Sequence, residues 1–226
     1  MATGLEIKQT RSFRPLKWLL RLLLLGLIIA AGYYALMWYS TGQLPIDLPI
    51  AAADPSVNET PISTLQRQDY HVDSSAPRLL TIAKLGLKDV RITPIELDKN
   101  RQLTMPKYLD DAGWFAKSAQ PGQGYGAVVL DGHSKGTART GIFTHLSSLK
   151  KGDVIDLERG DGKKLSYTVY DIHEMPTLEA LKSGIPQAMY PVDDTKEGLS
   201  IIAESGRFVP KDNDFNQRTI LRALRK

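Results

Sequence analysis

The sequence predicts a mainly β protein: a closed or nearly closed β-barrel of about eight strands with short helices, preceded by one transmembrane helix. The first observation behind this prediction is a single long apolar run near the N-terminus. The second is a series of short apolar or alternating runs after Pro77, separated by turn residues. Hydrophobic residues make up 42% and charged residues 24% of the 226 residues, as expected of one globular domain with appendages.

Residues 16–39 are predicted to form the transmembrane anchor. They read LKWLLRLLLLGLIIAAGYYALMWY, with no charge after Arg21. A helix of roughly 20 apolar residues spans about 30 Å of hydrocarbon. The run is apolar on all sides, which disfavours a buried core helix. Aromatic residues that suit the membrane interface lie toward its two ends: Trp18, Tyr33, Tyr34, Trp38 and Tyr39.

The charges around this run predict its orientation. Four basic residues precede it, namely Lys8, Arg11, Arg14 and Lys17, whereas none follows its charge-free part until Arg67. The positive-inside rule then places residues 1–15 in the cytoplasm and everything after Ser40 outside, as a single-pass cell-membrane protein. A cleaved signal peptide is the alternative, since Ala51–Ala53 have the small side chains of a processing site.

Composition excludes several classes of function. The formal net charge is +4, but up to Arg21 five basic residues face one acid, so the remainder carries 24 of each sign. A balanced remainder argues against a nucleic-acid surface. The absence of cysteine excludes disulfides, thiolate metal sites and thiol catalysis. No clustered carboxylate loop argues for a metal, and no motif implies a cofactor.

Residues 40–76 are predicted to be a proline-rich extracytoplasmic linker, extended between the membrane and a domain at residues 77–226. Within that domain, Glu158–Ser166 reads as a hairpin with Gly-Asp-Gly at its turn, and Leu178–Lys182 as one helical turn. The predicted strands are Leu79–Leu85, Val90–Ile95, Gly126–Leu130, Val154–Leu157, Leu165–Ile172, Leu199–Ala203 and Arg218–Ala223.

Several motifs occur in a specific order between about Arg78 and Ala223. These are LLTIAKL from Leu79, LDKNRQLTMP from Leu97, DAGWF from Asp111 with a following QPG, AVVLDGH from Ala127, and GIF from Gly141 followed by LKKGD. In this order and spacing they resemble the sortases, a family of cell-surface cysteine transpeptidases, and most closely their class E- and F-like members. The resemblance implies a sortase-like closed barrel.

The resemblance also implies where a catalytic site would lie. In such enzymes a thiolate attacks a peptide bond of a sorting signal, a histidine handles the protons and an arginine stabilises the developing oxyanion. The histidine corresponds to His133, at the end of a predicted strand, and the arginine to Arg218, which opens the last one.

The sequence departs from the family at the nucleophile. The family's strand reads approximately L-x-I-I-T-C-x-G, whereas Leu199–Gly206 reads LSIIAESG. Ala203 thus stands at the threonine position and Glu204 at the cysteine position. A carboxylate attacking an amide would have to form a mixed anhydride, which is uphill. We expect Glu204 to pair with Arg218 or His133 instead, raising the pKa of the histidine.

These residues predict a sortase pseudoenzyme that acts as a binding module for a sorting-signal-like peptide, a pilin-like surface protein or an active sortase. The alternative is an active transpeptidase or hydrolase in cell-wall protein anchoring that uses Ser205 with His133 and Arg218. Neighbouring residues on a strand face opposite sides, so Ser205 should point away from the cleft that Glu204 faces. A third possibility is a structural surface domain without a ligand.

Overall fold

The computed structural model describes residues 15–41 and 56–226. The chain divides into two compact units, residues 1–48 and 49–226, and each is described by itself. The predicted cytoplasmic segment, apart from Pro15, and the prolines at 45, 49 and 55 lie outside the described residues.

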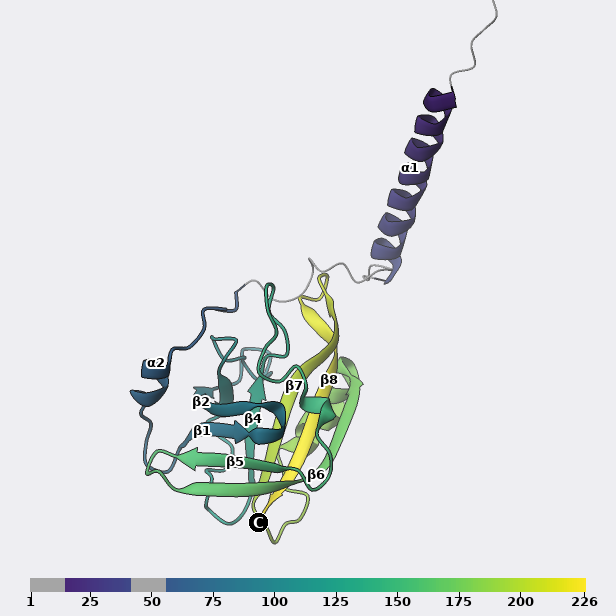
Figure 1. Cartoon of the computed structure of the whole chain (residues 1–226). Coiled ribbons are helices and arrows are strands. Elements are labelled where there is room, and N and C mark those ends of the chain that lie inside the picture. The colour runs from purple at the N-terminus through teal and green to yellow at the C-terminus, as the bar shows by residue number, and fades with distance from the viewer. Residues whose placement is uncertain (1–14, 42–55) are drawn as a thin grey trace, which may run out of the picture. The chain divides into compact units, whose positions relative to one another are not determined.

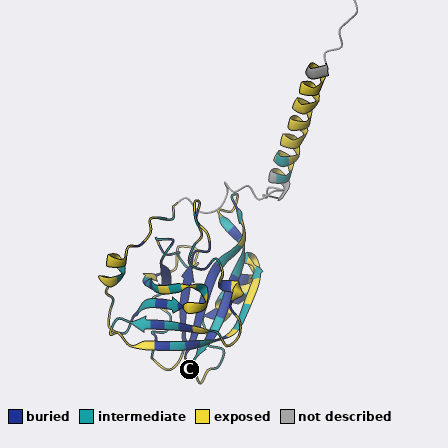
Figure 2. Cartoon of the chain, viewed as in Figure 1, coloured by how far each residue is buried: buried dark blue, intermediate teal, exposed yellow. Residues whose placement is uncertain are grey.

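The first unit contains helix α1 (Pro15–Thr41). Its segment Lys17–Met37 is long and apolar enough to cross a membrane. The leucines and isoleucines of that segment are exposed, as the yellow surface of α1 in Figure 2 shows. A helix with apolar side chains on all sides has no polar face to present to water. This matches the single N-terminal apolar helix that the sequence predicts.

The second unit is a closed barrel of eight strands in the order β1-β2-β3-β4-β7-β8-β6-β5 (Figure 1). Strands β2 and β3 pair in parallel, as do β4 and β7, and the other neighbours pair antiparallel. The strands are β1 (Pro77–Ile82), β2 (Leu87–Ile95), β3 (Ala112–Phe115), β4 (Ala127–Gly132), β5 (Val154–Arg159), β6 (Lys164–Pro176), β7 (Gly198–Val209) and β8 (Asp214–Arg225). The predicted fold class is confirmed.

Short helices fill the connections between strands. They are α2 (Thr64–Gln68), η1 (Ala83–Leu85), η2 (Leu146–Ser148), α3 (Thr177–Glu179), η3 (Ala180–Gly184) and α4 (Ile185–Ala188). The helical turn predicted at Leu178–Lys182 lies within α3 and η3. The predicted hairpin joins β5 to β6, with Gly162 in the left-handed region at φ 81°. Glycine adopts this conformation without the steric strain that a Cβ would add.

The barrel interior holds the main apolar core. Alternate residues of β4 and β7 point inward, for example Val128 and Leu130 on β4 and Ile201 on β7, all with no exposed surface. Their neighbours Val129 and Ile202 point outward. These outward side chains pack with Ile220 of β8 under Ala180 and Ala188 of the η3–α4 segment. The side chains two residues further along, Asp131 on β4 and Glu204 on β7, therefore lie on the same outer face, as does Arg218, which is opposite Glu204 on β8.

Residues 56–76 contact the barrel as an N-terminal arm, whereas the sequence analysis placed them in the extended linker. Ile62 and Ala76 are buried. The Arg78 Nε–H donates to the Tyr70 carbonyl at 2.7 Å, and a capping box between Ser63 and Gln66 begins α2. Folding back over the barrel gives these apolar and polar groups partners that an extended stalk could not. The remaining stalk lies outside the described residues.

Candidate functional site

Glu204 lies near the end of the regular part of β7 on the outer face of the barrel. Ala203 before it points into the core and is fully buried. Strand alternation then turns Glu204 outward, on the side that Ile202 also faces. Its partner across the antiparallel β7–β8 pair is Arg218. The two residues therefore share a face, as the sequence analysis expected of the site.

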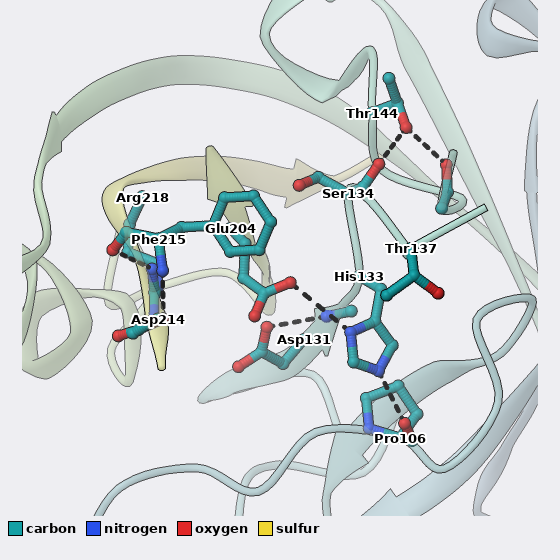
Figure 3. Close-up of polar contacts among 12 residues, drawn as sticks. Pro106, Asp131, His133, Ser134, Thr137, Thr144, Glu204, Asp214, Phe215 and Arg218 are labelled. Carbon is teal, nitrogen blue, oxygen red and sulfur yellow. Dashed lines mark hydrogen bonds and ion pairs between the residues drawn. The ribbon is translucent and has the colours of Figure 1, made fainter. Parts of the chain in front are cut away.

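His133 directly follows β4 and lies against Glu204 (Figure 3). Its Nε2–H donates to the Pro106 carbonyl at 2.8 Å, because a carbonyl can only accept. That bond leaves Nδ1 facing Glu204 Oε2 at 3.5 Å. The histidine is 3% exposed, so it is held in one orientation. Glu204 was expected to pair with Arg218 or His133, and in the structure its partner is His133.

Glu204 also sets the charge of this histidine. Burial alone would lower the pKa of His133, because it disfavours the charged imidazolium. The Glu204 carboxylate, the Pro106 carbonyl and the negative charge of Asp131 act in the opposite direction, and the pKa of His133 is raised overall. The pair is therefore an imidazolium facing a carboxylate over a wider pH range than a free histidine would allow.

Asp131 is a third titratable group on this face, and the sequence analysis did not single it out. It precedes His133 by two residues and pairs across β4–β7 with Ile202, which places it diagonally beside Glu204. It is 6% exposed, and its Oδ1 accepts from the Gly132 N–H at 2.7 Å. Burial, followed by the negative charge of Glu204, raises the pKa of Asp131 to about 7. A polar residue ending an otherwise apolar strand was the signal for it.

Arg218 lies on the same face but is engaged elsewhere. Its Nη2 donates to both carboxylate oxygens of Asp214, at 2.6 and 2.8 Å. Its Nη1 donates to the Thr177 hydroxyl at 3.2 Å and to the Phe215 carbonyl at 3.2 Å. The expected alternative pair of Glu204 with Arg218 is therefore not formed in the structure. Asp214 lies four residues earlier in β8, and one guanidinium nitrogen, Nη2, contacts both of its carboxylate oxygens.

These side chains line a cavity of about 580 Å³. Its walls come from the arm, the loop before β3, the ends of β4 and β7, the start of β8 and the η3–α4 segment. Its lining residues include Asp131, His133, Glu204, Asp214, Arg218 and the arm residue Val57. A volume of this size lies within the range of pockets that bury small ligands or peptide side chains.

Ser205 lies beside a different cavity, of about 330 Å³. Glu204 lines both cavities, whereas the residues lining the second include Ser205 and not His133. The Ser205 hydroxyl oxygen is buried and makes no hydrogen bond with the described residues. The alternation of strand residues accounts for this separation, since Glu204 and Ser205 point to opposite sides of β7.

The described part of the chain holds no group of three or more histidine, cysteine, aspartate or glutamate side chains suited to a metal ion. The site assembles two carboxyl groups, one of them able to hold a proton near neutral pH, beside an imidazole and an arginine that is bound to Asp214. Such a set can bind charged groups and exchange protons.

Comparison with known proteins identifies the fold. Residues 80–225 match the family model described as the sortase domain. Among solved structures, sortase A from Corynebacterium diphtheriae is 21% identical over 88% of this chain and 82% of that one, with a TM-score of 0.50. Its lid mutant is 23% identical over 72% and 75% of the two chains, also at 0.50. Sortase C-1 from Actinomyces oris is 20% identical over 88% and 98%, at 0.48. A search of the curated proteins found no match.

Proposed function

Because the chain belongs to the sortase family, we propose that it is a membrane-anchored peptide-binding protein outside the cytoplasm that lacks cysteine transpeptidase chemistry. The observation that carries this proposal is the position of Glu204. It stands where the family motif has its nucleophilic cysteine, and it faces His133 at 3.5 Å. The chain contains no cysteine that could replace that nucleophile.

The Glu204–His133 contact works against acyl transfer in two ways. A carboxylate is a weak nucleophile toward an amide, and the anhydride it would form is less stable than the amide. In addition, the carboxylate extends to higher pH the range in which the imidazole is a cation, because it raises the pKa of His133. A protonated imidazole cannot accept a proton from a nucleophile.

The two cavities beside Glu204 support the proposal that the domain still binds a peptide. A cavity of about 580 Å³ adjoins Glu204, and a second of about 330 Å³ meets it at the same side chain. A ligand extended across Glu204 would reach both. The family acts on sorting signals of surface proteins, so a sorting-signal-like peptide, on a pilin-like protein or another surface protein, is the ligand we propose.

Helix α1 supports the location. Lys17–Met37 is long and apolar enough to span a bilayer, and the basic residues before it favour a cytoplasmic N-terminus. We propose that this helix remains as the anchor and holds the domain outside the membrane. The domain would then meet its ligand at the cell surface.

Acyl transfer by Ser205 is the rival function. It requires the Ser205 hydroxyl to reach the His133 imidazole as a general base. The two side chains line different cavities, and Nε2 of His133 is bonded to Pro106. The orphaned Ser205 hydroxyl is the one observation in favour of this function.

The test is a binding and turnover assay on the full chain in nanodiscs. Residues 56–76 pack on the barrel, so the arm is kept. A sorting-signal peptide library is incubated with and without an amine acceptor. Mass spectrometry follows cleaved peptide, ligated product and acylated protein. The Ala203→Thr/Glu204→Cys variant restores both motif positions, and Glu204→Cys alone is its matched control, because Ala203 is fully buried and has little room for a hydroxyl.

We expect the native chain to bind peptide without turnover and the double variant to cleave it. Turnover by the native chain with an adduct on Ser205 would establish the serine mechanism instead. Absence of peptide binding by both the native chain and the variants would leave the ligand-free structural domain as the better description.

A further inference from the structure

We propose that the cavity beside Glu204 recognises a cationic side chain of its peptide ligand, the ammonium of lysine or the guanidinium of arginine, and that Asp131 and Glu204 receive that charge. This inference rests on the proposed function, because it names the chemistry of the peptide that the cavity takes. It adds a specificity determinant, Asp131, which lies within the AVVLDGH motif but for which the motif indicated no role.

The first observation is unused hydrogen-bonding capacity on the buried carboxyl group of Asp131 and on the buried Oε2 of the partly buried Glu204. Asp131 is 6% exposed, and among the described residues only its Oδ1 accepts a hydrogen bond, from the Gly132 N–H. Glu204 Oε2 is buried and has no hydrogen-bond partner in the described structure. Its contact with His133 Nδ1, at 3.5 Å, exceeds the usual length of such a bond. Buried carboxylates normally accept several hydrogen bonds, so these oxygens suit a donor that a ligand brings.

The second observation is where the nearby cations are directed. Arg218 of β8 donates to both oxygens of Asp214. Its charge also lowers the pKa of Asp131, but by less than burial and Glu204 raise it. Lys107, on the loop wall, is exposed to solvent. Asp98 of the same loop caps the backbone N–H groups of Asn100 and Gln102, each at 2.8 Å.

Among the charged groups of the described residues that line the cavity, His133 forms the ion pair with Glu204. Asp131 has no such partner there. When Asp131 is ionised, Asp131 and Glu204 carry two negative charges, which the His133 imidazolium and Arg218, itself bound to Asp214, offset only in part. A cationic ligand group would compensate it.

The third observation is the shape and lining of the cavity. Figure 3 shows the carboxyl groups of Asp131 and Glu204 turned toward one another beside the His133 ring. Leu103, Met105, Leu181 and Ile185 line other parts of the wall. Lysine and arginine need such a surface, because their methylene stems pack on apolar groups while the charged head reaches polar ones.

A cation placed between these carboxyl groups also changes their protonation. Asp131 holds a proton up to about pH 7 because of its burial and the negative charge of Glu204. A bound ammonium or guanidinium favours the ionised carboxylate, so binding releases that proton. Affinity for the cation should therefore rise as pH increases from 6 to 8, with Glu204, His133, Asp214, Arg218, Asp98 and Lys107 as the other charges facing the site.

The test uses small probes first, on the full chain in nanodiscs. Binding of n-butylguanidinium and n-butylammonium is measured by calorimetry at pH 6 and pH 8, with n-butylurea as the neutral counterpart. Asp131→Asn and Glu204→Gln keep the side-chain shape and remove the charge. Asp194→Asn is the control, because it removes an exposed carboxylate that precedes the first residue of β7, Gly198, and does not line the cavity.

We expect the two cations to bind and n-butylurea not to bind. Each charge-removing variant should weaken cation binding at least tenfold, as expected when one partner of a desolvated charge pair is removed. The control should bind like the native chain, and proton release should be larger at pH 6 than at pH 8. Cation binding that is unchanged in both variants would overturn the proposal. So would equal binding of n-butylurea, or a response to Ca²⁺ alone that depends on the same two residues.

Peptide pools separate this inference from the proposed function. Four pools carry lysine, arginine, norleucine or glutamate at one fixed position. Preference for the lysine and arginine pools, lost in Asp131→Asn, supports both proposals. Equal binding of the norleucine pool retains the proposed function and overturns the cationic inference. If no pool binds but n-butylguanidinium does so through Asp131 and Glu204, the cationic site stands and the peptide-binding function fails.

Discussion

Glu204 of β7 faces His133 beyond β4, with Oε2 3.5 Å from Nδ1. In the family motif, the position of Glu204 belongs to the nucleophile and the position of His133 to the general acid or base. The same histidine is fixed from its other side by the Pro106 carbonyl. A carboxylate at this position forms an ion pair with the imidazolium and supplies no thiolate.

Glu204→Gln should lower the pKa of His133, because it removes the carboxylate that raises it. Because the pKa of His133 is higher in the folded state than its ordinary value of 6.5, the protonated histidine stabilises the fold. This contribution is complete below pH 6.5 and is lost as pH rises through the folded-state pKa. The variant should therefore lose more stability at pH 6 than at pH 8. NMR titration of the imidazole measures the shift, with His71, His145 and His173 as internal controls. An unchanged pKa of His133 would contradict the ion pair.

The strands were predictable where alternation and turn chemistry agree. Each of the seven predicted runs overlaps an observed strand, because its apolar residues recur at the period of the pleat. Strand β3 was missed, since Ala112–Phe115 is only four residues long and contains a glycine. The reason for that glycine is tertiary: a Cβ at Gly113 would lie 2.7 Å from the Ile95 side chain of β2.

The site was predictable in part. Motif order indicated that His133, Glu204 and Arg218 would share a cleft, and all three line one cavity. The choice of partner was not predictable, because it involves Asp214, which lies beyond an irregular register between Ser205 and Phe208 in the β7–β8 pair. Asp131 was missed because its closeness to Glu204 depends on the parallel β4–β7 register. The arm was missed because its partners are distant in sequence, as for Arg139 with the Glu59 carbonyl.

Asp131→Asn should stabilise the domain at alkaline pH. Burial and Glu204 raise the pKa of Asp131 from 3.8 to about 7. Between about pH 4 and pH 7 the folded state thus binds more protons than the unfolded state, and stability falls as pH rises. Asparagine cannot ionise, so the variant should gain roughly 1–3 kcal/mol at pH 8 and little at pH 4. Thermal unfolding at the two pH values measures this. A loss of stability at pH 8 would mean that the native fold favours the charged carboxylate.

Arg91→Met should destabilise the junction between the arm and the barrel. Arg91 donates to both oxygens of Asp111 at 2.9 and 2.7 Å and lies over the rings of Tyr70 and Tyr108 at 5.4 and 5.5 Å. Asp111 is 1% exposed, so its carboxylate would be left buried and unpaired. Breaking a buried pair in this way costs about 3–5 kcal/mol.

The double variant Arg91→Met/Asp111→Asn is the matched control for that prediction. It removes the stranded charge together with the arginine, so it should be less destabilised than Arg91→Met alone. Denaturant unfolding of the native chain, of Arg91→Met and Asp111→Asn singly, and of the double variant gives the coupling free energy. Equal destabilisation of the two would indicate that Arg91 acts through its aromatic neighbours instead of through Asp111.

Glu197→Gln should lower the stability of the barrel end that lies away from Glu204. There Glu197 connects the loop at Gly122–Gly124 to Tyr167 of β6 by hydrogen bonds. Its carboxylate is 1% exposed and accepts from the Gly122 and Gly124 N–H groups at 2.9 and 2.7 Å. It also accepts from the Tyr167 hydroxyl and lies 3.4 Å from Arg225 Nη1. An amide would turn an N–H₂ group toward these donors, leaving buried groups unpaired at a cost of about 3 kcal/mol.

Two measurements check this prediction. Unfolding should show the loss of stability, and hydrogen exchange at the amides of Gly122 and Gly124 should accelerate, because their acceptor is weakened. The exposed Asp194→Asn substitution nearby serves as the control, with little change expected in either measurement. Since Glu197 and Glu204 lie toward opposite ends of β7, peptide binding at Glu204 should persist in Glu197→Gln under conditions where the variant is folded. Loss of binding with the fold intact would mean that the loop at Gly122 supports the cavity from a distance.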